Sequence, residues 1–134
     1  PALKKGKGTH KDNDSFFQSF KHAFAGFVYL IRNEKNAKIH LIATVVVLIL
    51  ASFLALNTIE WLFILVAIFL VWITELFNTA LENIFDLLEP RKNHLVKAGK
   101  DMSAAAVLFT AILSVIIGIV ILVPSLLEKI FSGS

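Results

Sequence analysis

Four polar side chains follow one stripe of a predicted helix near the middle of the chain: Glu75, Asn78, Glu82 and Asp86. Their spacings of three, four and four residues place them on one side of a helix. A long apolar run, Trp61 to Thr74, precedes them. Ionisable groups near the hydrocarbon of a bilayer are costly and usually mark a functional site. The stripe therefore indicates a candidate surface for metal binding and proton transfer.

Basic residues follow this stripe, at Arg91, Lys92, Lys97 and Lys100. Carboxylate oxygens suit Mg²⁺, which typically keeps few protein ligands and shares phosphate oxygens. Basic side chains neutralise phosphate charge, which is the main task in phosphoryl transfer. Glu75 lies deeper in the apolar run, where the hydroxyl of a membrane lipid would reach it. The pattern is compatible with phosphoryl transfer to a lipid.

Other interpretations of the acidic stripe remain open. It could be a solvated helix face, although the wholly apolar opposite face argues against this. Asn78 and one glutamate could instead join neighbouring membrane helices by hydrogen bonds. A non-enzymatic proton or cation pathway could be built from Glu75, Asn78 and Glu82. Standard nucleotide and zinc motifs are absent, because Gly99-Lys100 lacks an upstream glycine and no HExxH pairing exists.

Composition predicts a small integral membrane protein of one domain. The chain has 134 residues, of which 57% are hydrophobic, and a mean hydropathy of +0.76. This is more apolar than soluble domains, which have about 45–50% apolar residues. The absence of cysteine excludes disulfides and thiolate metal sites. We expect no cleavable signal peptide, because the first apolar stretch follows a long polar lead.

The amino-terminal part is expected to combine a tail with a membrane-surface helix. Residues 1–14 are basic and show no periodicity, so we expect a disordered tail. Over about 15–33, apolar residues recur at helical spacing opposite a basic polar face, with Asp14 or Ser15 placed to cap the helix. Such a helix suits the membrane interface. Its apolar positions are Phe16, Phe17, Phe20, Phe24, Phe27, Val28 and Ile31.

Three further runs are long enough to cross a bilayer, which takes about 20 apolar residues. They lie at about 38–57, 60–88 and 100–124, within a membrane domain expected over 15–127 and followed by a tail over 128–134. In the third run, small residues recur every seven positions, which allows close helix approach within or between subunits. These residues are Ala104, Ala111 and Gly118.

The basic residues predict the topology. Eight of the 13 Lys and Arg residues precede the first span, four lie between Arg91 and Lys100, and only Lys129 follows the third span. Because basic residues favour the cytoplasmic side, we expect a cytoplasmic amino terminus and 89–100 loop, and an external carboxyl terminus. The acidic stripe then opens towards the compartment that contains ATP.

Two motifs carry a resemblance to a known family, and they read Glu75-x-x-Asn78-Thr79-Ala80-Leu81-Glu82-x-x-x-Asp86 and Lys100-Asp101-Met102-x-Ala104-Ala105-Ala106-Val107-Leu108. Together with Arg32-Asn33-Glu34, they resemble the signature of the prokaryotic diacylglycerol kinase family, which includes the undecaprenol kinases. The resemblance covers about residues 15–124. It implies a homotrimeric, multi-pass protein of the bacterial inner (cell) membrane that phosphorylates a lipid alcohol with Mg²⁺ and ATP as co-substrate, without nucleic acid.

By motif position, the resemblance implies roles for individual side chains. Glu34 and Glu82 look like the metal ligands, Glu75 like the proton acceptor, and Asn78 like an active-site hydrogen-bonding group. The implied nucleotide contacts are Lys100, Asp101, Asp86, Arg91 and Asn93, and the implied lipid contacts are Ser19, Arg32 and Ala104. The residues alone leave simpler roles open, since Asp101 would also suit a helix cap and Lys100 would suit lipid headgroups.

The chain departs from the family pattern at Ser15, where many members carry an arginine that helps to hold the nucleotide. The loop Arg91-Lys92-Asn93 also differs from the diacylglycerol-specific members. The Phe-rich start and the pattern Arg32-Asn33-Glu34-x-x-x-x-x-His40 look more like Gram-positive-type undecaprenol kinases. We therefore expect undecaprenol as substrate and undecaprenyl phosphate as product, with diacylglycerol and phosphatidic acid as the alternative.

Overall fold

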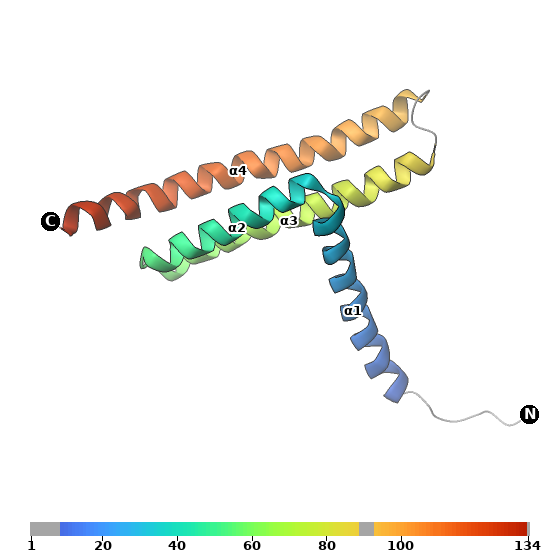
Figure 1. Ribbon diagram of the computed structural model, residues 1–134, viewed down its shortest axis with the longest axis horizontal. Helices are drawn as coiled ribbons and strands as arrows, with labels where there is room; N and C mark the ends of the chain where they lie inside the picture. The colour runs from blue at the N-terminus through green and yellow to red at the C-terminus, as the bar shows by residue number, and fades with distance from the viewer. Residues whose placement is uncertain (1–8, 89–92, 134) are drawn as a thin grey trace, which may run out of the picture.

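The structure is a computed structural model that describes residues 9–88 and 93–133, with side chains from Asp14 onward within these ranges. The described residues form four helices: α1 (Thr9–Asn33), α2 (Lys35–Phe53), α3 (Thr58–Leu87) and α4 (His94–Ser132). Helices α2, α3 and α4 run side by side, whereas α1 leaves them at a steep angle (Figure 1). Three of the four helices are long and apolar enough to cross a membrane: α2, α3 and α4. The predicted all-α membrane fold with three spans is confirmed.

Helix α1 is longer than expected. It begins at Thr9 rather than at Ser15, so residues 9–14 extend the helix instead of belonging to a disordered tail. No glycine or proline follows Gly8 in this stretch, so no helix-breaking residue ends the helix there. The apolar face of α1 is exposed, and its members Phe16, Phe17, Phe20 and Phe24 are each at least two-thirds accessible. An exposed phenylalanine face suits a helix that lies in a membrane interface.

The α1–α2 corner is held against α3 by an aromatic contact. Phe27 packs on Trp72 with ring centroids 4.9 Å apart. Leu30, Ala37 and Trp72 form a buried cluster beneath the corner. Between the two helices Glu34 has an extended backbone (φ −109°, ψ 122°), which breaks the helix at that residue. The corner therefore brings the chain around Glu34 over the middle of α3.

Helix α2 ends earlier than expected, at Phe53 instead of residue 57. The next helix follows after a short turn, because Asn57 and Glu60 form a capping box that starts α3 at Thr58. Each residue accepts a hydrogen bond from the backbone N–H of the other. The turn between the helices is anchored by Leu54 and Leu56, which are buried with Ala51, Ile64 and Leu122.

Helix α4 extends beyond the expected span at both ends. Asn93 caps it by accepting a hydrogen bond from the Leu95 backbone N–H, and the helix continues to Ser132 despite Pro124. The expected tail over 128–134 is therefore helical as far as Ser132. Side chains connect α4 to α3 along its length, through a Thr74–Thr110 hydrogen bond of 2.8 Å and a Ser114 hydrogen bond to the Ala67 carbonyl.

Candidate functional site

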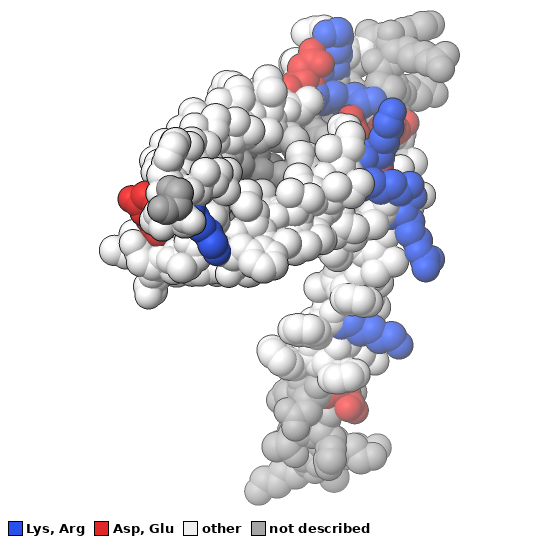
Figure 2. Space-filling view, turned by 60° about the vertical axis from the view of Figure 1, so that its left-hand side comes forward, with Lys and Arg blue, Asp and Glu red and all other residues white. Residues whose placement is uncertain are grey.

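The site follows the second half of α3, against which the α1–α2 corner packs near Trp72 and the start of α4 packs near Asp86 (Figure 1). Lys and Arg gather at this end of the molecule, while most of the remaining surface is uncharged (Figure 2). Three of the predicted carboxyl groups lie in this part of the molecule. Glu34 and Glu82 are half-buried, and both lie close enough to interact electrostatically with Glu75. The tertiary fold thus brings Glu34, from the α1–α2 corner, towards two carboxyl groups that α3 already carries on one face.

Glu75 is the most deeply buried member, with 1% of its surface exposed. Its Oε2 atom has no hydrogen-bond partner among the described residues. The nearest basic group is His40 on α2, whose Nε2 lies 3.7 Å from Oε2. That distance is too long for a hydrogen bond. Glu75 therefore has a carboxylate oxygen ready to accept a proton or a hydrogen bond from an incoming group.

Glu34 and Glu82 carry oxygen donors of the kind that a hard metal ion prefers. In the part of the chain that the structure describes, no three His, Asp or Glu side chains come together as a metal-binding group. Mg²⁺ does not need such a group, because it commonly binds one or two carboxylates together with water and substrate phosphates. Two half-buried carboxylates beside a third therefore fit Mg²⁺ in chemistry and in number.

Asn78 is joined to α4. Ser103, which is nearly buried, donates a hydrogen bond of 2.8 Å to Asn78 Oδ1. The interaction positions the amide and leaves its NH₂ group as a donor. Ser103 was missed by the sequence reasoning, and its place just after the Lys100-Asp101 motif was the only available signal. The interpretation of Asn78 as a link between helices is thus confirmed for this hydrogen bond. The bond is also compatible with a role of Asn78 in the site.

The predicted nucleotide-contacting residues separate into two ion pairs. Lys100 donates to Asp86 across the α3–α4 interface at 2.6 Å. Asp101 instead accepts from Lys97 on its own helix at 2.8 Å. Asp101 lies inside α4, so the interpretation of Asp101 as a helix cap is wrong. The close α3–α4 approach at this end depends on Gly99, where a Cβ atom would collide with the ring of Phe85.

The remaining predicted contacts are more scattered. Asn93 is exposed and caps α4, whereas Arg91 lies outside the described residues. Ser19, Arg32 and Ala104 are exposed. Within the described ranges, no hydrogen bond or ion pair joins these three residues to the carboxyl groups; Ser19 donates to the Ser15 carbonyl. Their predicted contact with lipid stays a prediction.

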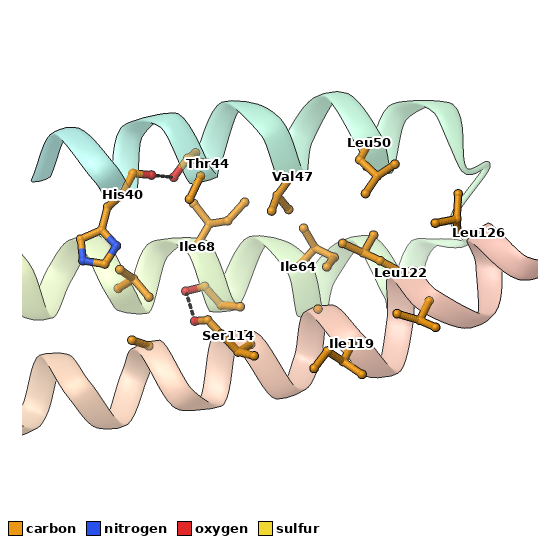
Figure 3. A pocket seen from close by; sticks show the side chains of 17 residues that line it. His40, Thr44, Val47, Leu50, Ile64, Ile68, Ser114, Ile119, Leu122 and Leu126 are labelled. Atoms are coloured by element: carbon orange, nitrogen blue, oxygen red, sulfur yellow. Dashed lines mark hydrogen bonds between the residues drawn. The ribbon is translucent and has the colours of Figure 1, made fainter. Parts of the chain in front are cut away.

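An apolar groove of about 490 Å³ runs from His40 along the bundle, between α2, α3 and α4 (Figure 3). A hydrogen-bond chain fixes its polar end, where Trp72 donates to Thr44 and Thr44 donates to the His40 carbonyl. Gly118 lines the groove, and nothing lies within 4 Å of the position of its absent Cβ. The small-residue stripe therefore makes no close helix contact at Gly118 within one chain.

Comparison with known proteins identifies the family of the chain. The model of the family described as prokaryotic diacylglycerol kinase matches residues 21–122. The chain is 38% identical to the undecaprenol kinase of Bacillus subtilis over 120 residues, which cover 90% of this chain and 98% of that relative. It is 42% identical to the diacylglycerol kinase of a Synechocystis species over 111 residues, which cover 82% of this chain and 63% of that relative.

Proposed function

Because the chain belongs to the prokaryotic diacylglycerol kinase family and is therefore a lipid kinase, we propose that it transfers the γ-phosphate of ATP to undecaprenol. The product is undecaprenyl phosphate. The choice of undecaprenol is supported by the similarity to an undecaprenol kinase, which extends over nearly the whole of both chains. Diacylglycerol is the second candidate, supported by the similarity to a diacylglycerol kinase. Membership of a kinase family replaces the interpretation as a proton or cation pathway.

The observation that carries the mechanism is the buried Glu75 carboxylate with an unpaired oxygen, beside Glu34 and Glu82. Glu75 accepts the proton of the lipid hydroxyl, because a proton acceptor must lie within hydrogen-bond reach of the proton that it removes. Glu34 and Glu82 hold Mg²⁺, which when bound neutralises charge on the phosphates. Asn78, held by Ser103, offers its amide NH₂ to an oxygen of the reacting groups.

The nucleotide is held by the start of α4. Lys100 neutralises phosphate charge, and it must exchange its present pairing with Asp86 for that contact. Asp101, Asn93 and Arg91 complete the nucleotide contacts. Ser19, Arg32 and Ala104 line the approach of the lipid; their exposure suits contact with a bilayer. Residues 15–127 form the kinase domain.

The assembly and its orientation are part of the proposal. We place the protein in the bacterial inner (cell) membrane as a homotrimer with a cytoplasmic amino terminus. The distribution of basic residues supports this orientation. The large share of exposed apolar side chains on α2, α3 and α4 supports burial against lipid or neighbouring subunits.

The test is phosphate transfer from labelled ATP by the purified protein with Mg²⁺, with undecaprenol and diacylglycerol offered together in mixed micelles. We expect labelled undecaprenyl phosphate in excess. Dominant phosphatidic acid would reassign the substrate to diacylglycerol. No transfer to either alcohol, from protein whose helical content and thermal transition show that it is folded, would contradict the proposed function.

A further inference from the structure

Two buried polar atoms on α3 have no hydrogen-bond partner among the described residues: Glu75 Oε2 and Thr79 Oγ1. Glu75 is 1% exposed and Thr79 is 4% exposed. The two residues are four positions apart, so their side chains are neighbours on one face of the helix. Unmatched buried polar groups are rare in proteins, because each loses its bonds to water without replacement. This pair therefore requires an explanation.

In contrast to Thr79, two other threonines in the bundle have hydrogen-bond partners for their hydroxyl groups. Thr74 lies on the same helix and bonds both to the Leu70 carbonyl and to Thr110 on α4. Thr44 bonds to the His40 carbonyl. A helical threonine usually satisfies its hydroxyl by such a bond to the preceding turn. Thr79 is buried in a helix that offers it the same option, and it makes no such bond.

The unmatched pair is complementary to one alcohol group. The Glu75 carboxylate only accepts hydrogen bonds, whereas the Thr79 hydroxyl also donates one. An alcohol placed between them would donate its O–H to Glu75 Oε2 and accept a hydrogen bond from Thr79 Oγ1. One lone pair of the alcohol oxygen would remain for attack on phosphorus. The same arrangement holds the oxygen still and removes its proton.

We propose that Thr79 binds the hydroxyl oxygen of the lipid alcohol and positions it for transfer. This inference rests on the proposed kinase function. In the step, the alcohol O–H bond breaks and its proton goes to Glu75. A bond forms between the alcohol oxygen and the γ-phosphorus, the bond from that phosphorus to the bridging oxygen breaks, and its electron pair leaves with ADP. Because both atoms are covered in the structure, the alcohol displaces part of the packing around them.

The test uses three variants of the full-length protein: Thr79→Val, Thr79→Ser and the matched control Thr74→Val. Valine keeps the branched shape and removes the hydroxyl. For Thr79→Val we expect a thermal midpoint in detergent no lower than that of the wild type, because no protein hydrogen bond is lost. We expect its kcat/KM for the lipid alcohol to fall about 10- to 100-fold, as when a site loses a hydrogen bond to substrate. Its KM for ATP should stay within about twofold.

The other two variants separate binding from structure. Thr79→Ser retains the hydroxyl and should restore most of the kcat/KM for the alcohol. Thr74→Val loses the bond to Thr110 and should lower the thermal midpoint, with little change in the kcat/KM of the folded enzyme. Wild-type kcat/KM in Thr79→Val would overturn the proposal. So would a fall in its thermal midpoint equal to that of Thr74→Val, because Thr79 would then serve the fold.

The test distinguishes this inference from the proposed function. Transfer by the wild type to neither undecaprenol nor diacylglycerol contradicts the function itself. If the wild type prefers diacylglycerol, the same comparison is made with that alcohol, since Thr79 is proposed to bind a hydroxyl that both lipids carry. A kinase that is fully active without the Thr79 hydroxyl contradicts only the inference.

Discussion

Helix α3 carries the same side chain in opposite states near its start and past its middle. At one end Glu60 is half-buried and accepts a hydrogen bond of 3.0 Å from the Asn57 backbone N–H, within the capping box. Fifteen residues further along, Glu75 is buried and its Oε2 has no hydrogen-bond partner in the described chain. A glutamate in an apolar helix is therefore not enough to indicate a reactive site. The unmet hydrogen bond distinguishes Glu75, the proposed proton acceptor, from the structural Glu60.

The lysines repeat this contrast. At the end of the bundle away from the site, Lys129 donates to the carbonyl of Phe53, the last residue of α2, and so joins α4 to α2. At the site end Lys100 pairs with Asp86, whose carboxylate is largely exposed. A phosphate could replace that carboxylate, whereas a backbone carbonyl at a helix end needs its donor. We therefore assign the Lys129 contact to the fold, and we propose that the Lys100–Asp86 pair opens to bind phosphate.

The largest effect that we expect is that of Glu75→Gln. It removes the proton acceptor and should lower kcat about 10²- to 10⁴-fold, the range attributed to general acid–base catalysis. The fold should persist, because glutamine is nearly isosteric with glutamate and carries no charge to bury. Glu60→Gln is the control, with kcat within a few fold of the wild type. Equal losses of kcat from the two variants, measured with labelled ATP, would remove the contrast between the two glutamates.

The next effect is expected for Glu82→Gln, which weakens the proposed Mg²⁺ site. We expect a loss of about 10- to 100-fold in turnover at fixed Mg²⁺, as found when metal-site groups are changed, with partial recovery at higher Mg²⁺. A Mg²⁺ titration of initial rates in both proteins measures this shift. Unchanged turnover and an unchanged Mg²⁺ dependence would remove Glu82 from the metal site.

A smaller effect is expected for Lys100→Ala. The loss of one charged contact to a phosphate should raise the KM for ATP about 10-fold, with a smaller effect on the KM for lipid. Lys129→Ala should leave the KM for ATP unchanged and lower the thermal midpoint, because it exposes the carbonyl end of α2. An ATP dependence altered by Lys129→Ala but not by Lys100→Ala would reverse our assignment of the two ends.

The smallest effect concerns packing. Gly99→Ala places a Cβ atom against the ring of Phe85 and should lower the free energy of unfolding by about 1–3 kcal/mol, the usual cost of overpacking. In Gly118→Ala the added Cβ atom meets open space within the chain, so the free energy of unfolding should change little. Thermal unfolding and size analysis in detergent measure both. A loss of oligomer in Gly118→Ala would show that the small-residue stripe packs between subunits.

Local patterns were sufficient for the type and approximate place of each helix, since a 20-residue apolar run or a phenylalanine face needs no tertiary information. The helix ends were less well predicted. The start of α3 at Thr58 was encoded by Asn57 and Glu60, a capping signal that is readable in the sequence. The continuation of α1 back to Thr9 and of α4 to Ser132 had no comparable signal, because polar and apolar residues alike continue a helix there.

By itself the sequence determined that Glu75, Asn78 and Glu82 share one face of one helix, because their spacing follows the helical repeat. Only the tertiary structure decided what faces them. The break between α1 and α2 places Glu34 within electrostatic range of Glu75, and His40 approaches Glu75 from α2. Whether Thr79 finds a hydrogen-bond partner also depends on packing. Contacts between residues far apart in the chain follow from how helices pack, and no local periodicity specifies them.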